Sequence, residues 1–379
     1  MKLRNKRAVG LAMAALMGST GLALADATTQ AELDALRARV EALESTTDTS
    51  NIPGDFRLGG TTVDLYGYVK ADFFYDFDFV QGDTAFVNAI GEPANATTGT
   101  FGATLRQSRI GVRTSTQTDI GELRGQLEFD LFASGGASEL RLRHANIQIG
   151  DHWTIGQTWT NFMPLNHYPT SVEFNGPVGI TFARVPQIRY TGTAGNLEYS
   201  FSIEENVAAS NDPVITAALA YTGDRFSARV AGLSGNVLVG GTEVDQTGVT
   251  ASGSFTPWEG GLFQATYTNG EALGPLLIGV GSAAVGGVAN DVEGYTLEFR
   301  QDVGSQWNFG IGYGREDYDL PTSTGTLNFT ELETVHVNAF YSPTDNLTFG
   351  AEYIFGERTS STGATVNGDR VQFSAQLNF

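Results

Sequence analysis

Cysteine is absent from the 379 residues, and histidine and methionine number only 4 each. Without cysteine the chain forms no disulfide, carries no thiolate nucleophile and offers no thiolate metal site. The histidines are scattered, and the sequence contains neither a G-x-S-x-G nucleophile motif nor a recognisable set of metal ligands. We therefore expect no catalytic residue, no bound metal and no cofactor, and we predict that the protein is not an enzyme.

Basic residues are also scarce: 22 Lys and Arg face 42 Asp and Glu, a formal net charge of −20. Binding to a nucleic acid needs Lys and Arg to neutralise phosphates, so nucleic acid is not an expected partner. Four aspartates, Asp72, Asp76, Asp78 and Asp83, lie close together in the sequence. Their order and spacing miss an EF-hand, so we favour a solvated acidic rim over a calcium site.

Long apolar runs are scarce except at the start of the chain. Basic residues precede an apolar stretch from Ala8 to Leu24, and Ala23 and Ala25 fit the A-x-A pattern of signal-peptide cleavage. We predict that residues 1–25 are a signal peptide and that the protein leaves the cytoplasm. The alternative, a membrane anchor helix, is disfavoured because glycine, serine and threonine interrupt a stretch already short for a bilayer crossing.

Residues 26–45 are predicted to contain a short helix. Apolar residues recur there at spacings of three and four, as in a coiled coil, and the seam consists of Leu33, Leu36, Val40 and Leu43. Two heptads are marginal alone, so the helix needs partners such as the other subunits of an oligomer. An amphipathic helix lying on its own subunit is the alternative. Residues 46–61 follow as a linker.

From Val63 to the C-terminus the apolar period changes to two. In residues 123–131, for example, leucine and phenylalanine alternate with charged and amide side chains. A soluble sandwich alternates too, but here brief turns alternate with mostly longer connections, which is the plan of an outer-membrane barrel. We predict an all-β fold in which residues 62–379 form a transmembrane antiparallel β-barrel of about 16 strands.

Aromatic residues support a membrane position for these strands. Trp153, Trp258 and Trp307 each lie beside a predicted short turn, where an interfacial aromatic girdle is expected. The last strand alternates and ends on Phe379, which is similar to the terminal strands recognised by the bacterial barrel-assembly machinery. An even number of strands places both ends of the barrel, and with them the predicted helix, on the periplasmic side.

Basic residues gather on the polar face of the first strands. Four of the first six predicted strands contribute arginine to the interior of the barrel: Arg109, Arg113, Arg124, Arg141, Arg143 and Arg189. Rings of basic residues select anions, so this wall predicts an anion filter. The alternative is that the arginines only neutralise inward carboxylates such as Glu128 and Asp130. An inward position for both Arg141 and Arg143 requires a β-bulge near His144, because the apolar phase changes there.

Residues 162–182 are too long and too apolar for a solvated loop tip. Their prolines argue against a regular strand, and an irregular backbone is tolerated at membrane depth where it lines a water-filled cavity. We predict that this segment folds into the pore as its constriction, with Glu173 and Asn175 near the tip and Arg184 on the return. The alternative is an external loop that touches a neighbouring subunit.

Four stretches resemble the DcaP-like family of porins. They are residues 63–78 (VDLYGYVKADFFYDFD), 106–114 (RQSRIGVRT), 140–162 (LRLRHANIQIGDHWTIGQTWTNF) and 173–192 (EFNGPVGITFARVPQIRYTG). The heptads followed by a barrel belong to the same resemblance, which extends from Ala31 to Phe379 and depends more on architecture than on motifs in the second half. The resemblance implies trimers of barrels, a periplasmic N-terminal coiled coil, and uptake of small organic anions such as dicarboxylates through a basic constriction.

Together these features predict an outer-membrane porin for passive diffusion of small hydrophilic solutes, with a preference for small organic anions. The expected partners are the other subunits of a homotrimer, outer-membrane lipid and lipopolysaccharide, and the solute itself. A non-selective or sugar-preferring porin is the alternative; a sugar channel should show a run of inward aromatics, and Tyr66 and Tyr68 are the close pair that the sequence offers. An outer-membrane enzyme would show a positioned nucleophile and base, and an adhesin would place its bulk in loops.

We expect the barrels to assemble mainly through packing of barrel against barrel. Removal of residues 26–54 is therefore predicted to leave the trimer intact, as measured by native mass spectrometry in detergent. Monomers from the truncated protein would show that the helices carry the assembly, and monomers from the full-length protein would contradict the trimer itself.

Overall fold

The structure is a computed structural model that describes residues 55–134, 139–319 and 329–379. The predicted signal peptide, the predicted coiled-coil helix and residues 46–54 of the predicted linker lie outside the described residues. In the described ranges, no helix combines the length and the apolar character that a helical membrane crossing requires.

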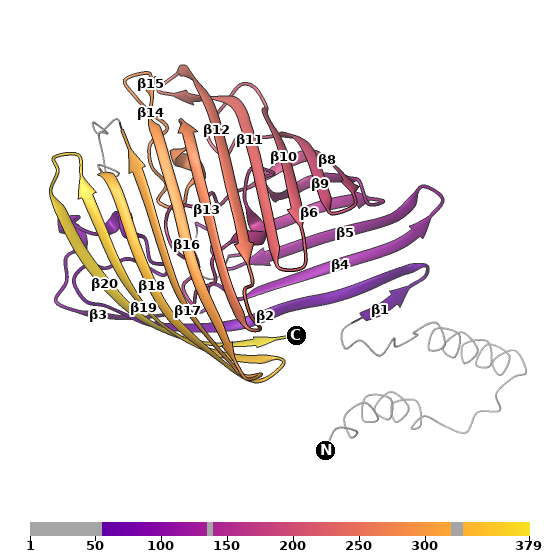
Figure 1. The fold of residues 1–379 in the computed structure, drawn as a ribbon, viewed down its shortest axis with the longest axis horizontal. Coiled ribbons are helices and arrows are strands. Elements are labelled where there is room, and N and C mark those ends of the chain that lie inside the picture. The colour runs from indigo at the N-terminus through magenta and orange to yellow at the C-terminus, as the bar shows by residue number, and fades with distance from the viewer. Residues whose placement is uncertain (1–54, 135–138, 320–328) are drawn as a thin grey trace, which may run out of the picture.

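Alternating apolar and polar residues form long antiparallel strands, and sixteen of these strands close into a barrel (Figure 1). The barrel strands are β2 (Thr61–Asp76), β4 (Arg109–Thr118), β5 (Gly121–Asp130), β6 (Arg141–Ile149), β7 (Trp153–Trp159), β8 (Arg184–Ala194), β9 (Leu197–Glu204), β10 (Val214–Thr222), β11 (Phe226–Val239), β12 (Thr242–Phe255), β13 (Gly261–Glu271), β16 (Asp291–Val303), β17 (Trp307–Tyr318), β18 (Phe329–Thr344), β19 (Leu347–Ser360) and β20 (Thr365–Asn378). The remaining described elements are the short strands β1 (Asp55–Leu58), β3 (Thr100–Thr104), β14 (Ala284–Val285) and β15 (Val288–Ala289), and the 3-10 helices η1 (Val87–Ala89), η2 (Pro93–Asn95), η3 (Leu165–His167) and η4 (Gly274–Leu276). The predicted all-β barrel is confirmed.

The ring closes where the first long strand meets the last. Residues 68–76 of β2 pair with β20, while the other edge of β2 pairs with β4 along residues 61–68 and with β3 along residues 72–76. Because β3 and β4 run in the same direction beside β2, they act as one strand with an interruption. The backbones of Phe379 and Gly67 exchange two hydrogen bonds, with N···O distances of 3.0 and 3.1 Å. Closure leaves no free edge in the ring.

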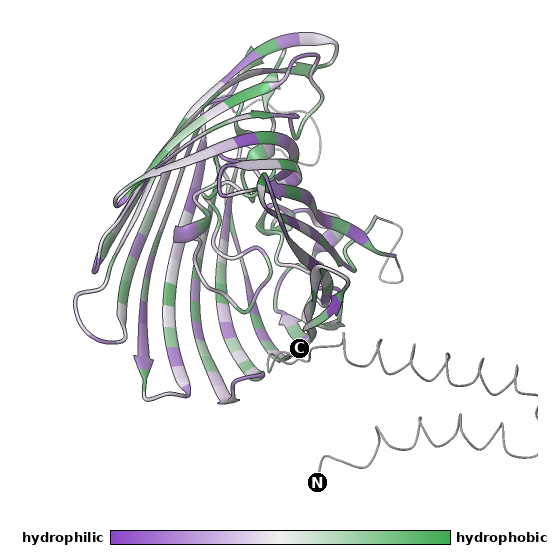
Figure 2. Cartoon of the chain, turned by 90° about the vertical axis from the view of Figure 1, so that its right-hand side faces the viewer, coloured by the Kyte–Doolittle hydropathy of each residue, from purple (hydrophilic) through white to green (hydrophobic). Residues whose placement is uncertain are grey.

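Side chains alternate between two environments along each strand, which Figure 2 shows as alternating hydrophobic and hydrophilic bands. On β18, His336 and Asn338 are 1% and 5% exposed, whereas Val337 between them is 44% exposed. The exposed set is apolar along most of the strand, as contact with lipid requires, and the inward set is polar.

The connections differ in length at the two ends of the barrel. At the short-turn end, brief turns such as residues 304–306 join the strands. The long-loop end carries the longer connections, among them residues 77–99, 160–183 and 272–290. One connection departs from the predicted alternation, because β11 and β12 meet at the long-loop end in a tight turn of Gly240 and Gly241. Their φ angles of 60° and 83° favour glycine, which suits a two-residue hairpin.

Three tryptophans mark the short-turn end, as predicted. Trp153, Trp258 and Trp307 are 45%, 50% and 44% exposed, and each lies at or beside a short turn. An amphipathic ring at this height suits the boundary between hydrocarbon and headgroups. The short-turn end therefore has one of the two aromatic girdles expected of a membrane barrel.

β6 contains the bulge that the sequence requires. In the ladder between β5 and β6, His144 faces Glu128 and Leu142 faces Phe129, so Arg143 has no partner on β5. The extra residue lets Arg143 lie inside the barrel, where it is 2% exposed, without turning the rest of the strand over. The predicted bulge is confirmed, one residue before its expected centre.

Outward positions at mid-strand face hydrocarbon, so a charge there is unfavourable. Replacing Val337 by arginine is expected to destabilise the folded barrel by about 2–4 kcal/mol, and the same change at Val303, beside a short turn, by about 0–1 kcal/mol. Urea-induced unfolding in phospholipid vesicles measures both losses. Equal losses at the two positions would contradict this assignment of the lipid-facing band.

Candidate pore constriction

The connection between β7 and β8, residues 160–183, lies inside the barrel. Four of its backbone N–H groups bind inward carboxylates of β16, β19 and β17. The pairs are Thr170 with Glu298 at 2.9 Å, Val172 and Glu173 with Glu352 at 3.0 and 3.1 Å, and Gly179 with Glu316 at 3.0 Å. Earlier in the segment, the His167 ring binds Ser227 of β11 and Ser252 of β12 at 2.7 Å each. The segment therefore crosses the lumen from β7 to the opposite wall.

Buried carboxylates replace a hydrogen-bond ladder for this segment. An irregular backbone inside a barrel must have its N–H groups satisfied, and one carboxylate can accept several bonds. Glu316, which is 0% exposed, accepts the N–H groups of Gly179 and Gly279 and the hydroxyl of Tyr318. A single side chain thus binds two different loops to β17.

Glu173 and Asn175 do not line an open path, which corrects the sequence prediction. They are 2% and 6% exposed. The Glu173 carboxylate accepts the N–H groups of Ala85, Asn175 and Gly176 at 2.8, 2.6 and 3.0 Å, and burial raises the pKa of Glu173. An acidic side chain within an irregular loop accepts hydrogen bonds from the backbone N–H groups around it in preference to binding a solute. The Asn-Gly pair two residues after Glu173 was a weak signal of such a turn.

Apolar side chains of three loops form a core inside the long-loop end. The buried core includes Ile90, Phe162, Ile180, Leu273, Leu277 and Leu332. Residues of β10, β11, β16, β17 and β18 belong to the same core, so the loops are packed against that side of the barrel. The strands from β4 to β8 form the other side of the lumen, and most of the predicted arginines lie there.

Arg109, Arg141 and Arg143 form an ion-paired cluster with two carboxylates. The N···O distances are 2.6 Å from Arg141 to Asp130, 2.6 Å from Arg143 to Glu128, and 3.8 Å from Arg109 to Glu128. Three guanidiniums share two carboxylates, so the cluster keeps a positive charge in excess. The arginines therefore neutralise the inward carboxylates, and one guanidinium charge of the cluster remains in excess.

Arg184 adds a further positive charge beside this cluster. Its guanidinium carbon lies 4.6 Å from the ring centroid of Trp159 and 5.7 Å from that of Phe182, and Arg143 lies over the same Trp159 ring at 5.8 Å. Among the described residues, no carboxylate oxygen is within 4.0 Å of Arg184, and its Nη1 is buried without an acceptor. A cation held by aromatic faces keeps its charge available to an anion.

Arg113 and Arg124 lie nearer the short-turn end and share an open cavity of about 340 Å³. Arg113, whose side chain is 54% exposed, lies 3.7 Å from the ring centroid of Tyr66 and 3.5 Å from a carboxylate oxygen of Asp64. Arg124 pairs with Glu122 at 3.0 Å, close to the start of β5. Arg124 therefore lines the mouth of the barrel rather than its constriction.

Arg189 lies apart from the cluster, and a second arginine, Arg229, accompanies it. Arg189 donates to the carbonyl oxygen of Trp159 at 2.5 Å, and Arg229 donates to that of Asn161. Sequence reasoning missed Arg229. Its alternation with Val230 on β11 was the signal, because Val230 faces lipid and is 45% exposed.

A row of aromatic rings, also missed from the sequence, lies beside the arginines. The centroids are 4.7 Å apart for Phe132 and Phe174, 5.9 Å for Phe174 and Phe182, and 5.0 Å for Phe182 and Trp159. Arg141 lies over both Phe132 and Phe174, at 5.2 and 5.8 Å. The row therefore joins flat apolar surface to the positive charge of the guanidiniums.

The first-loop aspartates are mostly ion-paired, which corrects the prediction of a solvated rim. The N···O distances are 2.6 Å for Asp76 with Arg370, 3.1 Å for Asp72 with Lys70, and 2.9 Å for Asp83 with Arg106. Asp72 and Asp76 are buried because they face the barrel interior from β2. In the described part of the chain, no group of three or more His, Asp or Glu residues is arranged to hold a metal ion.

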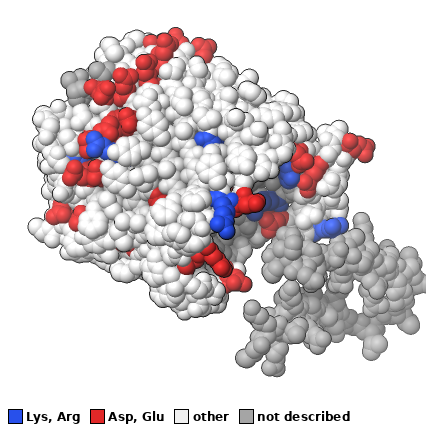
Figure 3. Space-filling model, viewed as in Figure 1, with Lys and Arg blue, Asp and Glu red and all other residues white. Residues whose placement is uncertain are grey.

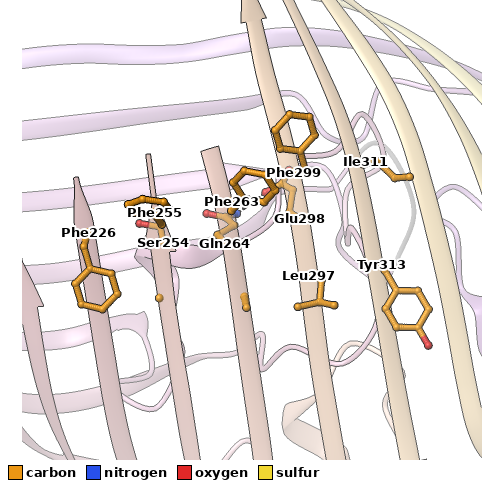
Figure 4. Close-up of a pocket in the computed structure, with 12 residues that line it drawn as sticks. Phe226, Ser254, Phe255, Phe263, Gln264, Leu297, Glu298, Phe299, Ile311 and Tyr313 are labelled. Carbon is orange, nitrogen blue, oxygen red and sulfur yellow. Dashed lines mark hydrogen bonds between the residues drawn. The ribbon is translucent and has the colours of Figure 1, made fainter. Parts of the chain in front are cut away.

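The outer wall also carries a recess, of about 540 Å³ (Figure 4). Its phenylalanine rings, from Phe226, Phe255, Phe263 and Phe299, lie on β11, β12, β13 and β16. The recess is almost wholly apolar and opens on the lipid-facing side, so it is not part of the solute path.

Glu173 accepts three N–H groups, whereas an amide offers one oxygen. Glu173→Gln is therefore expected to lower the thermal stability of the barrel, by about 1–3 kcal/mol, and to increase open-channel current noise, because the first loop and the constriction segment lose a shared anchor. A heat-induced gel shift and bilayer recordings measure the two effects. The control is Glu205→Gln at an exposed loop carboxylate; identical behaviour of the two variants would contradict the anchoring role.

A model of the DcaP outer membrane protein family matches residues 29–212 of the chain. A search of the curated proteins found no match. Among solved structures, the outer membrane channel DcaP of Acinetobacter baumannii is similar, with a TM-score of 0.77 and 23% sequence identity over 86% of this chain and 100% of that one.

Other porins share the same fold at lower similarity. The anion-selective porin from Comamonas acidovorans gives a TM-score of 0.62 at 16% identity, over 84% of this chain and 100% of that one. OmpT of Vibrio cholerae gives 0.59 at 17% identity, over 85% and 99%. At such identities the likeness establishes the fold alone, a porin barrel. Together with the match of residues 29–212 to the family model, this likeness shows that the chain has the fold of an outer-membrane porin and is similar to the DcaP outer membrane protein family.

Proposed function

We propose that this porin prefers small organic anions, dicarboxylates above all, among the small hydrophilic solutes that diffuse through it. One observation carries the proposal, the excess of guanidinium over carboxylate beside the constriction segment. The arginines there are Arg109, Arg141, Arg143 and Arg184, and the carboxylates that pair with them are those of Glu128 and Asp130.

The outer surface has the opposite charge. The net charge is −20, and acidic side chains gather on the surface toward the long-loop end, at the upper left of Figure 3. Salt screens charges beyond about 8 Å at physiological ionic strength, so these carboxylates act weakly on an ion inside the barrel. Arginines that line a narrow passage with low-dielectric walls act strongly. Local charge should therefore determine selectivity.

The arginine side chain favours carboxylates in particular. Its planar fork grips a carboxylate through two parallel hydrogen bonds. Arg141 already uses its fork on Asp130, with Nε and Nη2 at 2.9 and 2.6 Å from the two carboxylate oxygens. The fork of Arg184 binds no carboxylate among the described residues, so we assign the first contact with an entering carboxylate to Arg184. This contact must stay weak, because a tight site would block flux.

The solved structures are consistent with this preference. The Comamonas acidovorans barrel, which is described as anion-selective, shares the fold. A barrel of this fold can therefore prefer anions. Whether this chain does so depends on its own arginines.

The aromatic row favours one alternative, a sugar-preferring porin. Stacked rings at a constriction offer flat surfaces to a sugar, and Phe132, Phe174 and Phe182 lie in such a row. However, Arg141 and Arg184 lie over these rings, at 5.2 to 5.8 Å, so guanidiniums compete for the same faces. We therefore rank the sugar channel second.

The proposal extends to the surroundings of the barrel. The short turns would face the periplasm and the long loops the exterior, which places the helix of residues 26–45 in the periplasm. The outward apolar band would contact lipid and lipopolysaccharide, and three barrels would form a homotrimer. We propose no catalytic function for the chain.

The zero-current potential of single channels across a salt gradient tests the preference. We expect anion selectivity in the wild type and a severalfold lower anion-to-cation permeability ratio in Arg109→Ala and Arg184→Ala, because each removes a charge at the constriction. Arg113→Ala should have a smaller effect, since Arg113 lies nearer the short-turn end, away from the constriction, and has Asp64 at 3.5 Å.

The matched control is Arg315→Ala. Arg315 lies on the lipid-facing side of β17 and pairs with Asp317 at 2.8 Å. Cation preference in the wild type would refute the proposal. Equal ratios in the wild type and in all three pore variants would place the filter elsewhere.

A further inference from the structure

We propose that Arg189, Arg229 and Asn161 form a second binding site for the carboxylate of a small organic anion, separate from the arginines around Arg184. The inference rests on the proposed anion preference. It adds a further place where the anion is held and names the residues that hold it.

Both arginines are largely unsatisfied by the protein itself. They lie half-buried on the inward faces of β8 and β11. Arg189 uses Nη2 for the carbonyl oxygen of Trp159, and Arg229 uses Nη2 for the carbonyl and amide oxygens of Asn161. A guanidinium has five N–H donors, so most of them have no acceptor among the described residues. Two of these donors, Arg189 Nε and Arg229 Nη1, are buried.

No carboxylate of the described residues lies within 4.0 Å of either guanidinium. The acidic side chains that act on the pair from further away are Glu198 and Glu204. Glu198 is exposed to the surroundings, and Glu204 already accepts the N–H group of Asn161 at 2.8 Å and the hydroxyl groups of two threonines. Unpaired charge at membrane depth is unfavourable, and where it occurs it commonly marks a solute path.

Asn161 completes a set of donors. It is 2% exposed, and its amide oxygen accepts from the hydroxyl of Ser200 at 2.8 Å and from Arg229 at 3.3 Å. Because arginine can only donate, this contact assigns the accepting atom of the amide as its oxygen and the other atom as its nitrogen. That nitrogen is buried without an acceptor. A site made of two guanidiniums and an amide N–H group, with little competing negative charge, suits an acceptor-rich anion such as a carboxylate.

Trp159 connects this site to the first. Arg184 lies over the Trp159 ring at 4.6 Å, and Arg189 binds the Trp159 carbonyl oxygen. An anion that leaves Arg184 therefore meets the guanidinium of Arg189, which binds the same residue, Trp159. Two weak sites in series allow selection without the tight binding that would block flux.

Succinate binding to single channels tests the second site. The apparent dissociation constant is obtained from the concentration dependence of current fluctuations after succinate is added to one side. Arg189→Gln and Arg229→Gln are each expected to weaken binding by about tenfold, the loss of a charge-assisted hydrogen bond. Asn161→Asp keeps both arginines but gives Arg229 an internal carboxylate, so we expect a similar loss; this variant decides the matter if an arginine variant fails to fold.

The control is Arg315→Gln on the lipid-facing side of β17, which removes a charge outside the pore and should bind succinate like the wild type. Wild-type affinity in Arg229→Gln and Asn161→Asp, together with weakened binding in Arg184→Gln, would overturn the second site and leave the anion preference standing. A cation-selective wild-type channel would instead overturn the proposed function on which the second site rests.

Discussion

Backbone N–H and C=O groups at membrane depth must find their hydrogen-bond partners within the chain, and the rest of this structure depends on that constraint. The strands meet it through an unbroken ring of ladders. The constriction segment cannot, because its prolines and irregular path exclude a ladder. Inward carboxylates take over there: Glu298, Glu316 and Glu352 each accept backbone N–H groups of the segment. These acidic side chains inside the barrel thus have a structural role, because they bind the backbone of the constriction segment.

This use of carboxylates divides the lumen by charge. The inward carboxylates of β16, β17 and β19, which are Glu298, Glu316 and Glu352, bind the loops, and an apolar core fills the same side. On the opposite wall, Glu128 and Asp130 are outnumbered by the guanidiniums around them. A chain with a large acidic excess can therefore present a basic passage, because position rather than total charge decides what a solute meets.

The sequence was sufficient for features that follow from polarity alone. Because lipid lies outside the barrel and water inside, apolar and polar side chains alternate along each strand. The strands could therefore be predicted from this alternation, and the bulge beside His144 from the point where it shifts by one residue. Contacts between distant segments could not be predicted. The role of Glu173 depends on Ala85, 88 residues away, and the burial of Asp76 depends on Arg370, on the last strand. Local spacing carries no information about such partners. The inward position of Arg229 could have been predicted from its alternation with Val230, but it was missed.

The seam between β2 and β20 has a consequence for biogenesis. Asp76 and Arg370 are fully buried partners across that seam, 294 residues apart in the sequence. The ring is an open sheet with two exposed edges until β20 arrives, and closing so long a chain carries the largest entropic barrier. A nascent chain cut short before β20 would leave Asp76 without its cation and both edges open to proteolysis or aggregation. Closure of the ring therefore depends on β20, a strand of 14 residues.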